Sequence, residues 1–334
     1  MTMKKILGIG NALVDVLIRL DNDTLLSDFG LKKGSMTLVD KQKAKNILEA
    51  AASFDKQKSS GGSAANSIHG LAQLGAPAGY IGKIGDDEYG SFFRSYMTQN
   101  NIHSSLFKGG EETGKCISLI SKDSERTFAT YLGAAIELDR SDLNMDLFKN
   151  YDYVHLEGYL VQNHALVQEA VTLSRKAGNE ISIDLASFNI VEENVGFLRT
   201  IVEDYIDIVF ANEEEARAFT GKEDPAEALT EISKMCRIAV VKIGKQGSLI
   251  AEGNRRYQID PITVTPVDTT GAGDLYASGF YYGLAKEYPL DICGQLASAA
   301  AGKVVEVIGA KMDDHKWNEV MHLVDKIEDK KTST

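Results

Sequence analysis

The sequence predicts an α/β fold: a mostly parallel central sheet flanked by helices, with a small β-sheet lid. The first observation is that short runs of consecutive apolar residues, as in strands buried on both faces, alternate with helix-like stretches along most of the 334 residues. The second is that other segments alternate apolar and polar residues, as half-exposed antiparallel strands do. We expect the apolar runs to form the central sheet and the alternating segments to form the lid.

The buried strands are predicted at six apolar runs, and helix-like stretches, 164–176 among them, follow these runs. The runs are 6–9, 80–84, 153–156, 181–185, 206–210 and 238–241. The last third of the chain has helical patterns at 274–286, 291–307 and 313–327. We expect the residues after them, 329–334, to be a frayed tail.

The lid is predicted from two alternating regions. Residues 13–20 place Asp15 and Arg19 on one side of a strand, while 115–121 and 125–131 resemble the two arms of a hairpin. The lid is assigned to 13–40 and 106–133, and the α/β core domain to 1–12, 41–105 and 134–334. Because ligands of open α/β sheets bind at the carboxyl ends of the strands, we expect the lid to cover a site there.

Charge and composition exclude several classes of partner. The chain has 36 basic and 48 acidic residues, a net charge of −12, which argues against nucleic acid. An anionic ligand must therefore find local positive potential at helix N-termini, backbone N–H groups or a metal ion. Three scattered cysteines and no stretch of transmembrane length predict a cytoplasmic protein without a membrane partner. The choice between a monomer and a homodimer stays open.

The strongest motif is Asp268-Thr-Thr-Gly-Ala-Gly-Asp274, which leads into a helical pattern. The N–H groups of Gly271, Ala272 and Gly273 would face the space before the helix, beside the positive end of its dipole. That arrangement suits the charge of a transferring phosphoryl group, and Asp274 can take the proton of an attacking hydroxyl. The alternative interpretation is a tight glycine turn followed by an ordinary first-turn acid.

A second motif is Gly61-Gly62-Ser63-Ala64-Ala65-Asn66, at the start of a helix rich in small residues. The two glycines allow a ligand to approach the backbone, and Ser63 can cap the helix. Asn66 adds a group that both donates and accepts hydrogen bonds. The alternative is a plain strand-to-helix turn with a capping serine.

Together these strings resemble the two signatures of the ribokinase-like (PfkB) family of carbohydrate and nucleoside kinases. The resemblance spans nearly the whole chain, and the motifs occur in the family's order. It implies a mostly parallel sheet with a small β lid, and transfer of the γ-phosphoryl group of ATP, with Mg²⁺, to a hydroxyl of a sugar or nucleoside. It leaves a requirement for a monovalent cation open.

The resemblance also implies roles for individual residues. Asp274 resembles the catalytic base, and Gly271, Ala272 and Gly273 resemble the anion hole. The positions that resemble substrate contacts are Asn11, Asp15, Gly61, Gly62, Ser63, Asn66, Arg126 and Tyr159. Without the family, Arg126 would be interpreted as a solvated hairpin charge.

On the nucleotide side, Asn212-Glu-Glu-Glu215 is similar to an Asn-x-x-Glu motif associated with Mg²⁺ and phosphate, with Glu215 acting on Mg²⁺ through a bound water. The positions that resemble other ATP contacts are Lys242, Gly244, Gly247 and Thr269. The alternatives are an Asn cap with first-turn acids for Asn212 and Glu215, and an exposed turn residue for Lys242.

The acceptor is interpreted as a nucleoside because Asn11 and the segments 126–135 and 155–159 resemble the adenosine-kinase-like branch. Asp15 can accept two ribose hydroxyls while the 5′-hydroxyl meets Asp274. Candidates for a purine slot, each with core packing as the alternative, are Met36, Phe128, Tyr131 and Tyr159. A sugar kinase of the ribokinase or fructokinase type remains the second hypothesis, and a nucleoside- or sugar-binding regulator is the non-enzymatic one.

Overall fold

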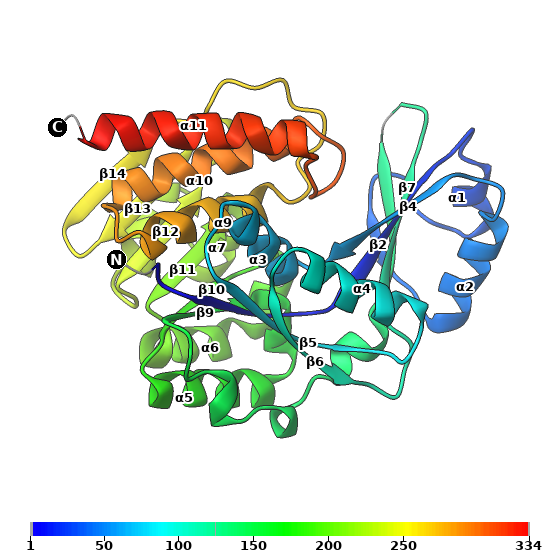
Figure 1. The fold of residues 1–334 in the computed structure, drawn as a ribbon, viewed down its shortest axis with the longest axis horizontal. Helices are drawn as coiled ribbons and strands as arrows, with labels where there is room; N and C mark the ends of the chain where they lie inside the picture. The colour runs from blue at the N-terminus through cyan, green and yellow to red at the C-terminus, as the bar shows by residue number, and fades with distance from the viewer. Residues whose placement is uncertain (1–2, 124, 333–334) are drawn as a thin grey trace.

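The computed structural model describes residues 3–123 and 125–332, and its larger sheet has the strand order β14-β13-β12-β11-β10-β9-β1-β5-β6 (Figure 1). Its strands are β1 (Ile6–Ile9), β5 (Ala78–Ile84), β6 (His103–Lys108), β9 (Tyr153–Glu157), β10 (Glu180–Asp184), β11 (Ile208–Asn212), β12 (Ile238–Lys242), β13 (Ser248–Glu252) and β14 (Arg255–Ile259). All neighbours from β12 to β6 are parallel, and β13 pairs antiparallel with both β12 and β14. The predicted mostly parallel sheet is confirmed.

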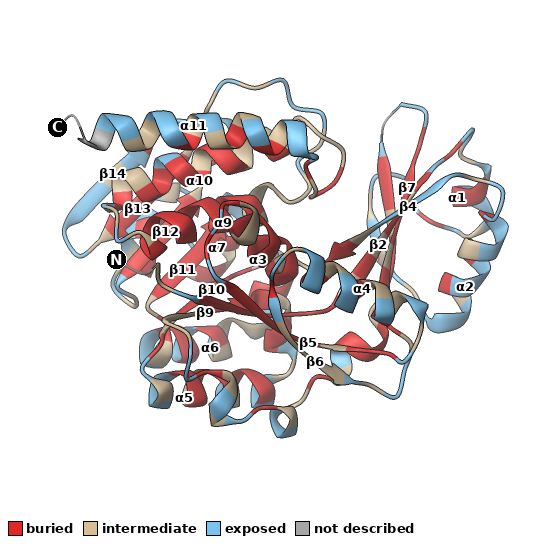
Figure 2. Ribbon diagram, viewed as in Figure 1, coloured by how far each residue is buried: buried red, intermediate tan, exposed pale blue. Residues whose placement is uncertain are grey.

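Helices cover both faces of this sheet because its strands are apolar on both sides. In β11, Ile208 and Phe210 pack against one helical layer, whereas Val209 and Ala211 pack against the other. The first layer has α3 (Ser63–Gln73), α4 (Glu88–Gln99), α9 (Ala272–Ala285), α10 (Leu290–Val304) and α11 (Asp314–Thr332). The second has α5 (His164–Ala177), α6 (Phe188–Tyr205), α7 (Glu213–Thr220) and α8 (Pro225–Ile232). Figure 2 shows that α9 is buried along nearly its whole length, as expected for a helix enclosed by α3 and α10.

The smaller sheet has the order β3-β8-β7-β2-β4 and projects from one side of the core, on the right in Figure 1. Its strands are β2 (Leu13–Arg19), β3 (Met36–Leu38), β4 (Lys56–Gly61), β7 (Gly114–Ile120) and β8 (Arg126–Tyr131). In β2, Val14, Val16 and Ile18 are buried in the cluster that includes α1 (Thr24–Asp28) and α2 (Lys41–Ala50). The alternation predicted for residues 13–20 therefore marks a two-faced strand, and Asp15 lies on the face away from these helices.

The predicted boundary between core and lid differs from the observed sheets. β4 pairs with β2 in the smaller sheet, although residues 41–105 were assigned to the core. Its sequence, Lys-Gln-Lys-Ser-Ser-Gly, has neither an apolar run nor apolar alternation, so it carries no strand signal. β6 extends the larger sheet as far as Lys108, beyond the predicted boundary at residue 105.

The predicted C-terminal tail is wrong for residues 329–332, because α11 continues to Thr332. Glu328 helps to hold the end of this helix: it accepts hydrogen bonds from Tyr282 and Lys286 at 3.2 and 2.6 Å. Residues 333 and 334 of that tail, and residue 124 in the predicted hairpin turn, lie outside the described residues.

No helix of the described chain has both the length and the apolar composition that crossing a bilayer requires.

Candidate active site

Asp274 lies in the first turn of α9, three residues after Gly271, which has a left-handed backbone conformation. Gly271 caps the helix with φ of 79°, and a Cβ there would lie 2.5 Å from the Cβ of Ala310. The Asp274 carboxylate accepts hydrogen bonds from Ser63 Oγ at 2.6 Å and from Asn66 Nδ2 at 2.9 Å. The two sequence motifs, more than 200 residues apart, therefore meet at one carboxylate.

The surroundings of Asp274 set its ionisation. Burial raises its pKa above the ordinary aspartate value, and the hydrogen bonds from Ser63 and Asn66 oppose that shift. These donors stabilise a carboxylate that can still accept a proton. The predicted helix-capping role of Ser63 is wrong, because Gly62 occupies the N-cap position and the Ser63 hydroxyl is directed to Asp274 instead.

The predicted anion hole needs one correction. The N–H of Ala272 donates to the carbonyl of Thr269 at 3.1 Å, so it is already paired. In the part of the chain that the structure describes, the N–H groups of Gly271 and Gly273 have no protein acceptor. The ammonium of Lys242 lies beside them: a Cβ on Gly273 would be 3.2 Å from Lys242 Nζ. The start of α9 thus combines backbone donors with a side-chain cation.

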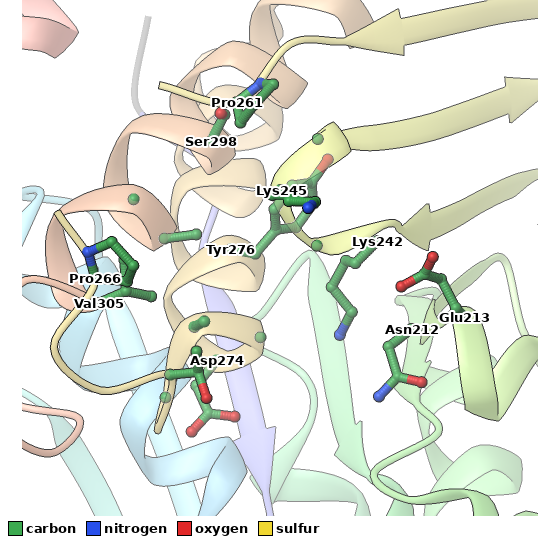
Figure 3. A pocket seen from close by; sticks show the side chains of 18 of the residues that line it. Asn212, Glu213, Lys242, Lys245, Pro261, Pro266, Asp274, Tyr276, Ser298 and Val305 are labelled. Atoms are coloured by element: carbon green, nitrogen blue, oxygen red, sulfur yellow. The ribbon is translucent and has the colours of Figure 1, made fainter. Parts of the chain in front are cut away.

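A cavity of about 1020 Å³ opens in front of this helix start (Figure 3). The candidates from the sequence that line it are Ser63, Tyr159, Asn212, Glu215, Lys242, Gly244, Gly247, Thr269, Gly271, Ala272, Gly273 and Asp274. Every position with an implied ATP contact is in this set, and Ser63 and Tyr159 are there too, although their implied contacts are with the acceptor. The far wall was not predicted as part of a site: it is formed by residues 261–264 with Pro266, Ser298 and Val305, of which Ser298 lies in α10 and Val305 directly follows this helix.

Lys242 ends β12 and extends toward the space between Asp274 and Asn212 (Figure 3). Its ammonium is 2.7 Å from Asp184 Oδ2, and its side chain is only 15% exposed, so the alternative of an exposed turn residue is wrong. Burial alone would lower its pKa, but the charges of Asp184 and Glu215 outweigh that effect and raise the pKa. Lys242 is therefore a permanent cation at neutral pH. Asp184 itself was missed, because a single acid ending an apolar run is a weak signal.

Asn212 and Glu215 form a reciprocal cap at the start of α7. Asn212 Oδ1 accepts from the Glu215 N–H at 2.9 Å, and the Glu215 carboxylate accepts from the Asn212 N–H and Nδ2 at 2.8 and 2.7 Å. Burial, followed by the charge of Asp184, raises the pKa of Glu215 to about 7. The interpretation of Asn212 and Glu215 as helix-capping residues is therefore confirmed, and both carboxylate oxygens of Glu215 accept hydrogen bonds from Asn212.

Whether these residues fit Mg²⁺ depends on their donor atoms. Among the described residues, no group of three or more His, Cys, Asp or Glu side chains forms a ready metal site. Mg²⁺, however, is usually held by one or two carboxylates together with substrate phosphates and water. Asp184 and Glu215 supply carboxylate oxygens at the cavity wall, each with lone pairs left. The pair fits a site that contacts Mg²⁺ through water and phosphate.

Two of the acceptor-side candidates, Gly61 and Gly62, lie where the lid strand β4 leads into α3, close to Asp15 and Asn11. A Cβ on Gly61 would lie 2.2 Å from Asp15 Oδ1, and one on Gly62, whose φ is 95°, would lie 2.0 Å from the Asn11 carbonyl oxygen. These glycines make room for Asp15 and Asn11, which is a different reason from the predicted approach of a ligand. Burial raises the pKa of Asp15 to about 6, with the positive charge of Lys311 opposing the shift.

Asn11 contacts Glu157, a residue that the sequence did not single out. Asn11 Nδ2 donates to Glu157 Oε1 at 2.7 Å, and the N–H of Ala64 donates to Oε2 at 3.1 Å. Burial raises the pKa of Glu157 to about 7, and these hydrogen bonds limit the shift. The Asn11 amide nitrogen is thus committed to Glu157, so a substrate contact of this side chain would use Oδ1.

Arg126 joins the lid to the loop that precedes Asp274. Its guanidinium is 2.7 Å from Asp268 Oδ2 and 3.4 Å from the Thr270 hydroxyl, and its side chain is 9% exposed. The Asp268 carboxylate also accepts from the N–H of Gly309 at 2.7 Å. The alternative of a solvated hairpin charge is therefore wrong.

Comparisons with known proteins agree with this geometry. The sequence pattern described as "pfkB family carbohydrate kinase" matches residues 32–317. A 5-dehydro-2-deoxygluconokinase of Clostridium perfringens is 29% identical over 73% of this chain and 78% of its own length. An adenosine kinase of Schizophyllum commune is 26% identical over 97% of this chain and 100% of its own length.

Two solved structures resemble the chain over almost its whole length. The structure of a probable sugar kinase from Rhizobium etli has a TM-score of 0.86 and 33% identity, and covers 96% of this chain and 99% of its own. The structure of an adenosine kinase from Sinorhizobium meliloti has a TM-score of 0.85 and 31% identity, with the same coverage of 96% and 99%.

Proposed function

The chain belongs to the PfkB family of carbohydrate kinases, and we propose that, within this family of ATP-dependent sugar and nucleoside kinases, it phosphorylates the 5′-hydroxyl of adenosine or a close nucleoside. One observation carries the proposal. Asp274 lines the cavity that holds the ATP candidates, and it is also within electrostatic range of Asp15 on the lid. A base at this junction can serve a hydroxyl from the lid side and a phosphoryl group from the cavity side.

The residues support a division of tasks in the transfer. The Asp274 carboxylate takes the proton of the attacking hydroxyl. The ammonium of Lys242 and the N–H groups of Gly271 and Gly273 stabilise the charge of the transferring phosphoryl group. Mg²⁺, when held near Asp184 and Glu215, supplies further neutralisation of the phosphate charge.

The lid face favours a nucleoside over a simple sugar. Strand register places Leu17, Ser118, Phe128 and Met36 in one row across the sheet, next to the row that begins with Asp15. Because side chains alternate between faces, Leu17, Phe128 and Met36 share the face of Asp15. Met36 is 53% exposed, so part of this apolar surface is uncovered. A suitable ligand for such a face has hydroxyl groups at one end, which can bind to Asp15, and a flat apolar group at the other end, which can pack against Leu17, Phe128 and Met36.

Tyr131, another candidate for the purine slot, lies on the wrong face. It pairs with Lys115 and shares the row of Val14, which is buried beneath the outer helices. Its hydroxyl donates to Glu111. The prediction that Tyr131 lines a purine slot is therefore wrong, whereas Met36 and Phe128 are suitably placed.

A sugar kinase remains the second candidate, because the sequence relatives include 5-dehydro-2-deoxygluconokinases at similar identity. The cytoplasmic location, the monomeric or homodimeric state and any monovalent-cation requirement stay predictions of the sequence.

An acceptor panel tests the proposal. We expect kcat/KM with ATP to be at least about tenfold higher for adenosine than for ribose, fructose or 5-dehydro-2-deoxygluconate, since one well-buried apolar group contributes about that factor. Phe128→Ala should reduce this preference, while Tyr131→Phe, on the opposite face, should preserve it. A sugar or sugar acid that is turned over more efficiently than every nucleoside would establish the second candidate instead.

A further inference from the structure

Lys311 follows a loop that packs directly against the loop of Asp274. Gly309 donates its N–H to Asp268, and Ala310 lies against Gly271. The next side chain, Lys311, runs inward from there, toward α3 and α4, and its ammonium lies 5.5 Å from the centre of the Tyr96 ring. The position of Lys311 is thus fixed by the same contacts that build the start of α9.

The Lys311 ammonium is shielded from solvent although part of its stem is accessible, and within the described residues it has no hydrogen-bond partner. An isolated buried ammonium is strongly unfavourable unless opposite charges or a ligand compensate it. The charged and titratable groups around it are Asp15 on β2, Asp274 on α9, His69 on α3 and Tyr96 on α4, with Arg126 of β8 beyond Asp15. Two of these are the carboxylates assigned to the acceptor and to the base.

Lys311 and the neighbouring Asp15 each influence the pKa of the other. Burial lowers the pKa of Lys311 to about 8, and the charges of Asp15 and Asp274 oppose that shift. Conversely, the positive charge of Lys311 is the largest influence that lowers the pKa of Asp15 against its burial. Without this cation, two carboxylates would repel each other in a site shielded from water.

The two buried lysines lie in different surroundings beside Asp274. Lys242 lines the cavity and pairs with Asp184, whereas Lys311 is absent from the cavity wall and interacts with Asp15. Nearby, Asn66 Oδ1 is also buried and unpaired among the described residues. The acceptor side therefore has its own cation, separate from the one available to ATP.

We propose that Lys311 is a positioning residue of the kinase reaction: its buried ammonium, held by the loop that packs against the start of α9, favours the ionised form of Asp15, so that this carboxylate can accept the hydroxyls of the acceptor beside the base Asp274. This inference rests on the proposed function. It deepens that function by assigning the electrostatic support of the acceptor-side carboxylate to one residue outside the sequence motifs.

The pH dependence of kcat/KM for the acceptor, at saturating Mg²⁺ and ATP, tests the role. In the wild type, efficiency should rise as Asp15 ionises near pH 6, and the Lys311 charge should set the position of this rising limb. Lys311→Arg keeps the positive charge, so the rising limb should stay close to its wild-type position and activity at pH 7 should be largely retained.

Lys311→Met removes the charge. We expect the rising limb to move up by about one pH unit, as loss of a nearby opposite charge does, which lowers kcat/KM by about tenfold at pH 5 but only by about twofold at pH 7. Lys286→Met is the matched control: this lysine is paired with Glu328, away from the site, and the variant should keep the wild-type profile.

The outcomes separate the two proposals. A wild-type protein that phosphorylates no acceptor would overturn the proposed function and this role with it. An active wild type whose rising limb is unchanged in Lys311→Met would overturn the role of Lys311 alone. The same holds if Lys311→Met lowers only the melting temperature, because a purely structural lysine would not move the rising limb of the profile.

Discussion

Asp274→Asn should lower kcat by at least about a hundredfold, because general-base catalysis typically contributes about 10²–10⁴-fold. Asparagine keeps the size of the side chain and an oxygen that can accept from Ser63, but it cannot take the proton of the attacking hydroxyl. ATP and the acceptor should still bind, since the cation of Lys242 and the N–H groups of Gly271 and Gly273 are untouched. Steady-state kinetics together with equilibrium binding of both substrates measure this difference.

Asp291→Asn is the matched control for that experiment. Asp291 is also a first-turn acid, at the start of the neighbouring α10, so its loss reproduces the helix-dipole effect without removing a base. Both variants should melt close to the wild-type temperature. The loss of a general base should lower kcat by much more than about tenfold. If Asp274→Asn retains more than about a tenth of the wild-type kcat, Asp274 is therefore only an acid at the start of a helix.

Removal of Mg²⁺ should abolish turnover. The nucleotide side of the cavity is lined by Asp184 and by the acids 213–215 as well as by Lys242, so ATP meets substantial negative charge there. Lys242 is already paired with Asp184, which limits the charge it can offer to the phosphates. Lys245 and the N–H groups of Gly271 and Gly273 also line the cavity, and a divalent cation supplies the further neutralisation that the phosphates of ATP need. Activity measured in a chelator and restored by titrating Mg²⁺ checks this expectation.

Glu215→Gln should raise the Mg²⁺ concentration needed for half-maximal activity by about tenfold or more, the usual effect of removing a group that holds the metal through water. Glutamine can still accept a hydrogen bond from Asn212, so the cap of α7 is largely kept. Glu227→Gln, a first-turn acid of α8, is the control and should leave the Mg²⁺ requirement unchanged. An unaltered requirement in Glu215→Gln would restrict Glu215 to its capping role.

The central sheet was predictable because its strands are buried on both faces and therefore read as continuous apolar runs. β4 was not, because Lys56-Gln-Lys-Ser-Ser gains its place by hydrogen bonding to β2 and not by burying side chains. Likewise, the polar end of α11 depends on contacts of Glu328 with residues more than 40 positions away. The local pattern of apolar and polar residues does not reveal stabilisation by such distant contacts.

The candidate site was predictable where a motif is contiguous, as at Gly271 to Asp274. Glu157, Asp184 and Lys311 were missed because each is a single charged residue whose meaning arises only when the fold brings it to a carboxylate or an ammonium. Glu157 and Asp184 share one signal, a charged side chain at the end of a strand, whereas Lys311 lies in the connection between α10 and α11. Many exposed residues share that signal.

The most direct measurement of the central claim is the fate of the γ-phosphoryl group of labelled ATP incubated with the protein and adenosine. The account predicts that the label appears on the 5′-oxygen, with one ADP formed for each nucleoside monophosphate. 5′-Deoxyadenosine, which lacks the attacking hydroxyl, should bind but receive no label. Label released only as inorganic phosphate, or transferred equally well to 5′-deoxyadenosine, would contradict the assignment of Asp274 to a nucleoside 5′-hydroxyl.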